Sequence, residues 1–155
     1  MSQTAHYREQ HAEIMDLVGQ IQALLDPVTL VAQSQQAWQL LIQLSGKLSI
    51  HLAAEDLQLY PQCQRSSHAP LRVLGERFAR DMQPISRTFT AYAMKWRGSM
   101  SIASNPKGFI ADTQQVFSAL GERVHQEETV LYVALDEGPE DCLVAVPSYA
   151  TSGSV

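Results

Sequence analysis

Apolar residues recur every three or four positions in four long segments of this 155-residue chain. The segments cover residues 4–25, 34–60, 69–96 and 105–138. This period is typical of amphipathic α-helices, whereas the alternation expected of half-buried strands is scarce. Helix breakers flank the segments, so the pattern predicts four separate helices that begin or end near Pro27, Pro61, Pro70, Pro106 and Pro139.

Four helices of similar length with short connections predict an all-α fold, a four-helix up-down-up-down antiparallel bundle. We assign this single domain to residues 1–138, with a short turn within residues 27–33 and a loop over residues 98–104. Residues 139–155 are interpreted as an extended or mobile C-terminal tail. The apolar fraction of 45% suits one domain with a real core.

Polar residues that interrupt the apolar faces are the candidate chemistry of the chain. His51 and Glu55 stand four residues apart in the second segment, so they share one helix face at the edge of the apolar stripe. His11 interrupts the first apolar face, and in an antiparallel bundle it should lie at the level of His51. Burying such groups is costly unless something compensates them, and a bound cation is one efficient compensation.

Two acidic residues extend this predicted cluster to the other two helices. Asp81 follows Phe78 by three residues, and Glu127 stands where the fourth helix should carry an apolar side chain. Pro84 lies inside the third helix and predicts a kink beside Asp81. We therefore predict a metal site formed by His11, His51, Glu55, Asp81 and Glu127. Two imidazoles with several carboxylates suit iron, manganese or zinc.

Arg123 supplies the main alternative, because it stands four residues before Glu127. An internal ion pair of Arg123 with Glu127 or Asp81 would neutralise the core without a metal. One metal ion, a carboxylate-rich site with two ions, and a core without metal are all open at this point. Glu128 and His125 are expected to face solvent, and Tyr7 is a candidate hydrogen-bond donor behind the ligands.

Charge and composition exclude several classes of partner. The net charge is −5 and the basic residues do not cluster, so we expect no nucleic-acid or membrane partner. The N-terminus is polar and carries no signal-peptide pattern. Cys63 and Cys142 are far apart, so we expect reduced thiols and a cytoplasmic protein.

Three stretches of the chain resemble one protein family. They read YREQHAEIMDLV, HLAAEDLQLYP and EETVLYVAL, and they begin at Tyr7, His51 and Glu127. Together they are similar to the hemerythrin-like, HHE cation-binding proteins. The resemblance implies a four-helix bundle with a non-haem di-iron site, in proteins that bind or sense oxygen or handle iron. His11 matches the family's first histidine, and His51 with Glu55 match the histidine and bridging glutamate of its second helix.

The second half of the chain departs from the family pattern. Its third helix has no histidine, and Met82 beside Asp81 stands where the resemblance places one. Arg123 replaces the histidine of the fourth helix. At least two nitrogen ligands are therefore missing, which argues against an oxygen carrier and leaves the arginine charge as a substitute for one metal ion.

These observations favour a metal-binding protein that senses, binds or stores iron or a small ligand such as O2. The expected cofactor is non-haem iron, mono- or dinuclear, or another transition metal. The alternatives are a metal-free interaction domain with an ion network centred on Arg123, and a non-haem metal oxidoreductase. No general base or substrate loop stands out, so an enzyme is less favoured. A homodimer through an exposed helix face or the apolar tail is an open alternative.

Overall fold

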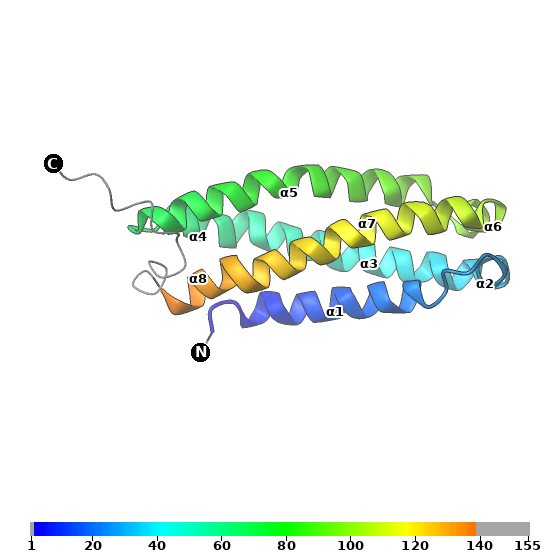
Figure 1. Cartoon of the computed structure of the whole chain (residues 1–155), viewed down its shortest axis with the longest axis horizontal. Coiled ribbons are helices and arrows are strands. Elements are labelled where there is room, and N and C mark those ends of the chain that lie inside the picture. The colour runs from blue at the N-terminus through cyan, green and yellow to red at the C-terminus, as the bar shows by residue number, and fades with distance from the viewer. Residues whose placement is uncertain (1, 139–155) are drawn as a thin grey trace.

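A computed structural model of the chain describes residues 2–138, and these are helical almost throughout, with no strand among them. The chain passes four times along the long axis of the molecule and reverses direction each time (Figure 1). The first pass is α1 (Ala5–Gln22), and the third is α5 (Ala69–Lys95). The prediction of an all-α fold is confirmed. The predicted tail and Cys142 lie outside the described residues.

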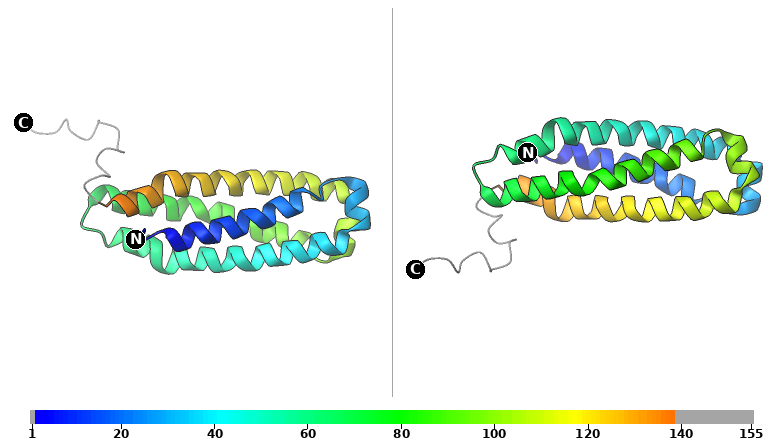
Figure 2. Two further views of the ribbon diagram at one scale, coloured as in Figure 1. Left: turned by 90° about the horizontal axis from the view of Figure 1, so that it is seen from below. Right: turned by 90° about the horizontal axis from the view of Figure 1, so that it is seen from above.

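The second and fourth passes are each interrupted by a wide π-helical turn. The second consists of α3 (Ser34–Ala54), the π turn η1 (Glu55–Leu59) and α4 (Tyr60–Gln64). The fourth consists of α7 (Pro106–Gln126), the π turn η2 (Glu127–Leu131) and α8 (Tyr132–Glu137). Two short helices, α2 (Pro27–Ala32) and α6 (Ser99–Ser104), connect the passes at the end of the bundle remote from the N-terminus (Figure 2).

Local sequence signals explain where several helices begin. The side chain of Asp26 accepts a hydrogen bond from the backbone of Thr29 at 3.0 Å, and a proline follows it at the start of α2. Asn105 accepts from the backbone of Gly108 at 3.1 Å, and Pro106 begins α7. These are N-caps followed by proline in the first turn, the combination that the sequence predicted for α7.

Two local expectations differ from the structure. The predicted loop over residues 98–104 contains the helix α6. Pro61 does not end the second pass, because the π turn starts a new α-helical segment at Tyr60 and places the proline in its first turn, where its missing N–H is tolerated. The kink at Pro84 stays a prediction, since α5 is helical on both sides of this residue, and the widened turns lie on the other two passes, where they begin at Glu55 and Glu127.

The apolar core is divided into two clusters along the bundle. One contains the residues toward α2 and α6, among them Ile14, Leu44 and Phe117. The other lies toward the end that holds α4 and α8, and includes Leu59 and Leu131. Three of the helical passes carry a buried polar or charged residue between these two clusters. These polar residues therefore lie at one level of the bundle.

Candidate metal centre

Four buried ligand groups converge at this level from α1, α3 and the two π turns. His11 of α1 and His51 of α3 are each only 2% exposed, and Glu55 is fully buried. The Nε2 atoms of the two histidines lie 3.0 Å apart. Oε2 of Glu127 lies 3.0 Å from Nε2 of His11 and 3.9 Å from that of His51, while Oε1 of Glu55 lies 2.9 Å from Nε2 of His51. This is the convergence expected of His11, His51, Glu55 and Glu127.

The other ring nitrogens are held by acceptors outside the cluster. Nδ1 of His11 lies 3.1 Å from a carboxylate oxygen of Glu128, which can only accept. Nδ1 of His51 lies 2.8 Å from Oε1 of Gln10, whose amide nitrogen in turn contacts His6 at 3.0 Å. Each Nδ1 therefore carries the hydrogen, and each Nε2 presents a lone pair to the cluster. Such outer partners orient histidines that bind metals.

Two facing lone pairs repel unless a proton or a metal ion lies between them. In the metal-free cluster the proton belongs to His51: burial lowers its pKa, but the adjacent Glu127 and Glu55 outweigh burial and raise it to about 9. Burial raises the pKa of Glu55, whereas the histidines and Arg123 hold that of Glu127 below its ordinary value against the effect of burial.

One buried carboxylate oxygen is left without a hydrogen bond. Oε1 of Glu55 lies 2.9 Å from His51 Nε2 as an ion-pair contact and has no hydrogen-bond partner among residues 2–138. An unsatisfied buried acceptor costs about 1–3 kcal/mol. This oxygen points at the same nitrogen that faces His11, so a cation bound there would satisfy all three atoms.

The separations also fit the dimensions of a transition-metal site. Two ligands at right angles, each about 2.1 Å from an ion, lie roughly 3.0 Å apart. Candidate ligand atoms of His11, His51 and Glu127 all lie within 4.8 Å of one another. Neutral imidazoles with carboxylates are ligands for iron, manganese and zinc. The residues present therefore fit a metal ion.

Tyr132, the residue directly after η2, packs against the cluster of histidines and glutamates. Its hydroxyl lies 3.2 Å from Oε2 of Glu55, 3.4 Å from Oε2 of Glu127 and 3.3 Å from Nε2 of His11. Its ring stacks on His11 with centroids 5.3 Å apart. Burial raises the pKa of Tyr132 far above its ordinary value, with the two glutamates adding to the effect. The hydroxyl therefore keeps its proton and can donate it to one carboxylate.

Arg123 occupies the neighbouring part of the same polar layer. It is 4% exposed, and its Nε donates to Oε1 of Glu127 at 2.5 Å. Its Nη2 donates to the hydroxyl of Tyr60 at 2.9 Å and to the carbonyl of Phe78 at 2.7 Å. The two oxygens of Glu127 are thus divided, with Oε1 bound to the guanidinium and Oε2 facing the histidines. The guanidinium does not lie between the imidazoles.

The structure does not bring Asp81 to the cluster. Its side chain is 55% exposed, and its carboxylate lies 3.5 Å from Nε of the adjacent Arg80. Met82 faces the cluster instead, because the buried side of α5 follows Phe78 and Met82, which are four residues apart. Asp81, one residue earlier, is turned by about 100° from Met82. The expectation that Asp81 points at the seam is therefore corrected.

Sequence reasoning also missed three groups around the site. Glu128, expected in solvent, holds His11, and the wide π turn explains why neighbouring Glu127 and Glu128 both face α1. Gln10 and Tyr132 were not anticipated; the signal for Tyr132 was its place after EETVL, matching Tyr60 after EDLQL. Tyr7, proposed as a donor, packs the edge of its ring against His51.

Comparison with known proteins agrees with this geometry. No helix of residues 2–138 is both long and apolar enough to cross a bilayer. A search of curated proteins and a search of solved structures found no significant match. Residues 2–135 match the family model described as the hemerythrin HHE cation binding domain. That match covers nearly the whole chain and confirms the resemblance, so the protein belongs to the hemerythrin HHE cation-binding family.

Proposed function

We propose that the chain binds a single transition-metal ion, iron in the first instance, through His11, His51, Glu55 and Glu127. The observation that carries the proposal is the pair of Nε2 atoms 3.0 Å apart, whose lone pairs are turned toward each other by hydrogen bonds on Nδ1. The unsatisfied oxygen of Glu55 supports it independently. A bound metal would release the histidine proton and would offer a Lewis-acidic centre to a small ligand.

The surroundings favour one ion over two. A second metal would need ligands from α5 and α7, where the side chains facing the cluster are Met82 and Arg123. The guanidinium already compensates Oε1 of Glu127, as a second cation would. Four protein residues would bind the ion, and the apolar Met82 side chain on the remaining side supplies no charged ligand. A coordination position would therefore be left for an exogenous ligand. We therefore propose binding or sensing of a small ligand such as O2, or iron handling, as the function.

Elemental analysis of protein purified without added metal tests this proposal. The wild-type chain should contain about one metal ion per molecule, and His51→Ala should contain far less because one of the four proposed ligands is lost. His125→Ala is the matched control, since His125 is exposed on α7. Equal metal content in wild type and His51→Ala would refute the proposal, and a ratio near two would replace it with a dinuclear site.

A metal-free interaction domain is the second candidate, and one observation favours it. Arg123 gives Oε1 of Glu127 a charged partner without any metal, so much of the polar core is satisfied in the free protein. In that case a chelator would leave the thermal stability unchanged. A metal-dependent rise in melting temperature that disappears in Glu55→Gln would exclude this candidate.

A further inference from the structure

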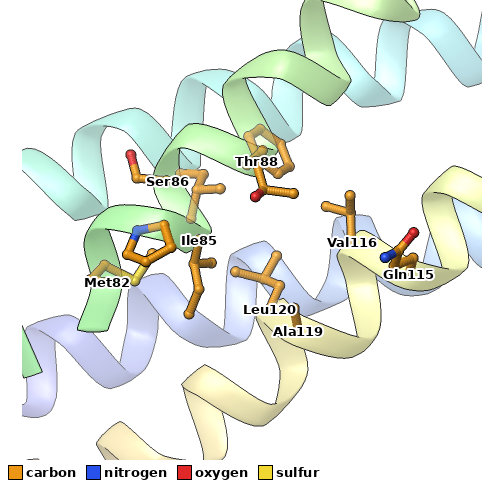
Figure 3. Close-up of a pocket in the computed structure, with 11 residues that line it drawn as sticks. Met82, Ile85, Ser86, Thr88, Gln115, Val116, Ala119 and Leu120 are labelled. Atoms are coloured by element: carbon orange, nitrogen blue, oxygen red, sulfur yellow. The ribbon is translucent and has the colours of Figure 1, made fainter. Parts of the chain in front are cut away.

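A cavity of about 250 Å³ opens between α5 and α7 beside the candidate metal centre. Its walls are mostly apolar, and Figure 3 shows Met82 at one end and Gln115 at the other, with Ile85 and Leu120 between them. The proposed metal site does not use this space. Its size, chemistry and position all bear on what it could hold.

The cavity reaches the centre of the bundle and is more than a surface groove. Leu48 forms part of its wall, although this residue belongs to α3 and the opening lies between α5 and α7. Leu48, Phe89 and Leu120 are also members of the apolar core. A helix of another protein docks on a surface and would not reach α3. A small molecule can enter between α5 and α7 and touch all three helices.

Small side chains and a proline line the opening. Ser86 of α5 and Ala119 of α7 line it, and Pro84 of α5 also belongs to the lining. Thr88 and Gln115 are exposed at the rim. Among the described residues, the hydroxyls of Ser86 and Thr88 and the amide of Gln115 have no hydrogen-bond partner. An apolar chamber with a few polar groups at its mouth is typical of small-molecule sites.

One layer of side chains separates this cavity from the metal cluster. Leu48, Met82 and Leu120 line the cavity and also line the small space that contains His11, His51, Glu55 and Glu127. Met82 is unbranched and adapts its shape more easily than its neighbours. A molecule in the cavity would therefore press on the side chain that faces the ligands.

We propose that this cavity binds a small apolar molecule, up to a fused two-ring compound in size, in contact with Met82. A dry cavity of about 150 Å³ binds benzene, and the volume here is 250 Å³, so a bicyclic molecule such as indole has room. A single ring nitrogen could reach the polar groups at the rim. The proposal concerns the metal-free protein as well, and it does not depend on the proposed metal.

Calorimetric titration of the metal-free protein with indole tests the proposal. We expect saturable one-to-one binding with a negative heat-capacity change, as burial of apolar surface requires. The ε-methyl resonance of Met82 should shift during the same titration. Ala119→Trp, at an exposed position on the rim, should fill the opening and weaken binding by about tenfold or more. Val116→Phe fills the cavity from inside and provides a second variant.

Ser118→Trp is the matched control, because it places the same side chain one residue earlier on α7, outside the lining. It should bind indole within about twofold of wild type. Absence of saturable binding would overturn the proposal. So would binding that both filling variants retain, because the ligand would then lie elsewhere. Loss of metal in the His51→Ala experiment would leave indole binding intact, so the two proposals fail separately.

Discussion

Two stretches of the molecule, residues 51–60 and 123–132, follow the same plan with different charges. Each begins with a basic side chain, His51 or Arg123, four residues before a glutamate. Each glutamate starts a π turn, and a tyrosine follows each turn. The histidine half holds a group that can lose its proton and bind a metal, whereas the arginine half holds a permanent cation.

The tyrosine of each stretch contacts the charged residues of the other stretch. Tyr132, from the arginine half, approaches Glu55 and His11, while Tyr60, from the histidine half, accepts a hydrogen bond from Arg123. Glu127 belongs to both halves, since its two oxygens contact Arg123 and His11. One cation, the Arg123 guanidinium, is therefore built into this core, and the other must be a proton or a metal ion.

Replacing the built-in cation should have the largest effect. Arg123→Met removes the partner of Glu127 Oε1, Tyr60 and the Phe78 carbonyl, and leaves buried groups unpaired. We expect a loss of about 3–5 kcal/mol in the free energy of unfolding, measured by urea denaturation. Arg77→Met is the matched control, because the Arg77 guanidinium also lies over the Phe78 ring but is exposed. Equal losses in both variants would contradict a special role for Arg123.

Removing the metal should destabilise the cluster around His51 and leave the Arg123 hydrogen bonds unchanged. With free metal about a thousandfold above its dissociation constant, binding should stabilise the fold by about 4 kcal/mol. For a domain of this size that corresponds to a melting temperature roughly ten degrees higher. Calorimetric scans of loaded and chelator-treated protein measure the difference. A rise of similar size in Glu55→Gln would show that the metal binds elsewhere.

Raising the pH should remove the proton of His51, while the Arg123 guanidinium keeps its charge. The pKa of His51 is about 9 in the metal-free fold and 6.5 in the unfolded chain, so the stability it contributes is complete below pH 6.5 and is lost as pH rises through 9. The full difference corresponds to about 3 kcal/mol.

Metal affinity should change in the opposite direction over the same window, because protons compete with the metal for Nε2. The stabilisation by metal should therefore grow from pH 6 to pH 9 while the metal-free protein becomes less stable. Denaturation with and without metal at several pH values measures both trends. Metal-free stability that stays constant from pH 6.5 to pH 9 would show that no proton is held between the histidines.

The smallest effect should come from the outer partner of His51. Gln10→Leu removes the acceptor that orients the imidazole, and second-layer changes of this kind lower metal affinity by about 10- to 100-fold. A competition titration against a coloured chelator measures this change. Gln20→Leu is the control, because Gln20 is exposed on the same helix and, among residues 2–138, its side chain donates a hydrogen bond to Asp16 and to no metal-site residue. Unchanged affinity in Gln10→Leu would mean that packing alone orients His51.

Much of the fold could be predicted because the spacing of apolar residues and the positions of helix-breaking residues act on local structure. The same spacing rules identified His11, His51, Glu55 and Glu127, since each interrupts an apolar face at helical spacing. The prediction for Asp81 was wrong by one position, because the next residue, Met82, is the buried one. Either Asp81 or Met82 could have faced inward by sequence pattern, and only the packing of α5 against its neighbours selected Met82.

The amino-acid sequence by itself determined four amphipathic helical passes, the capped starts of some helices, and the residue types able to bind a metal. Only the tertiary structure decided that Glu128 and Gln10 fix the histidine tautomers, that Arg123 takes one oxygen of Glu127, and that a cavity lies behind Met82. The physical reason is that helical periodicity depends on near neighbours. Protonation, pairing and empty space depend instead on groups from different helices, which come together only when the bundle packs.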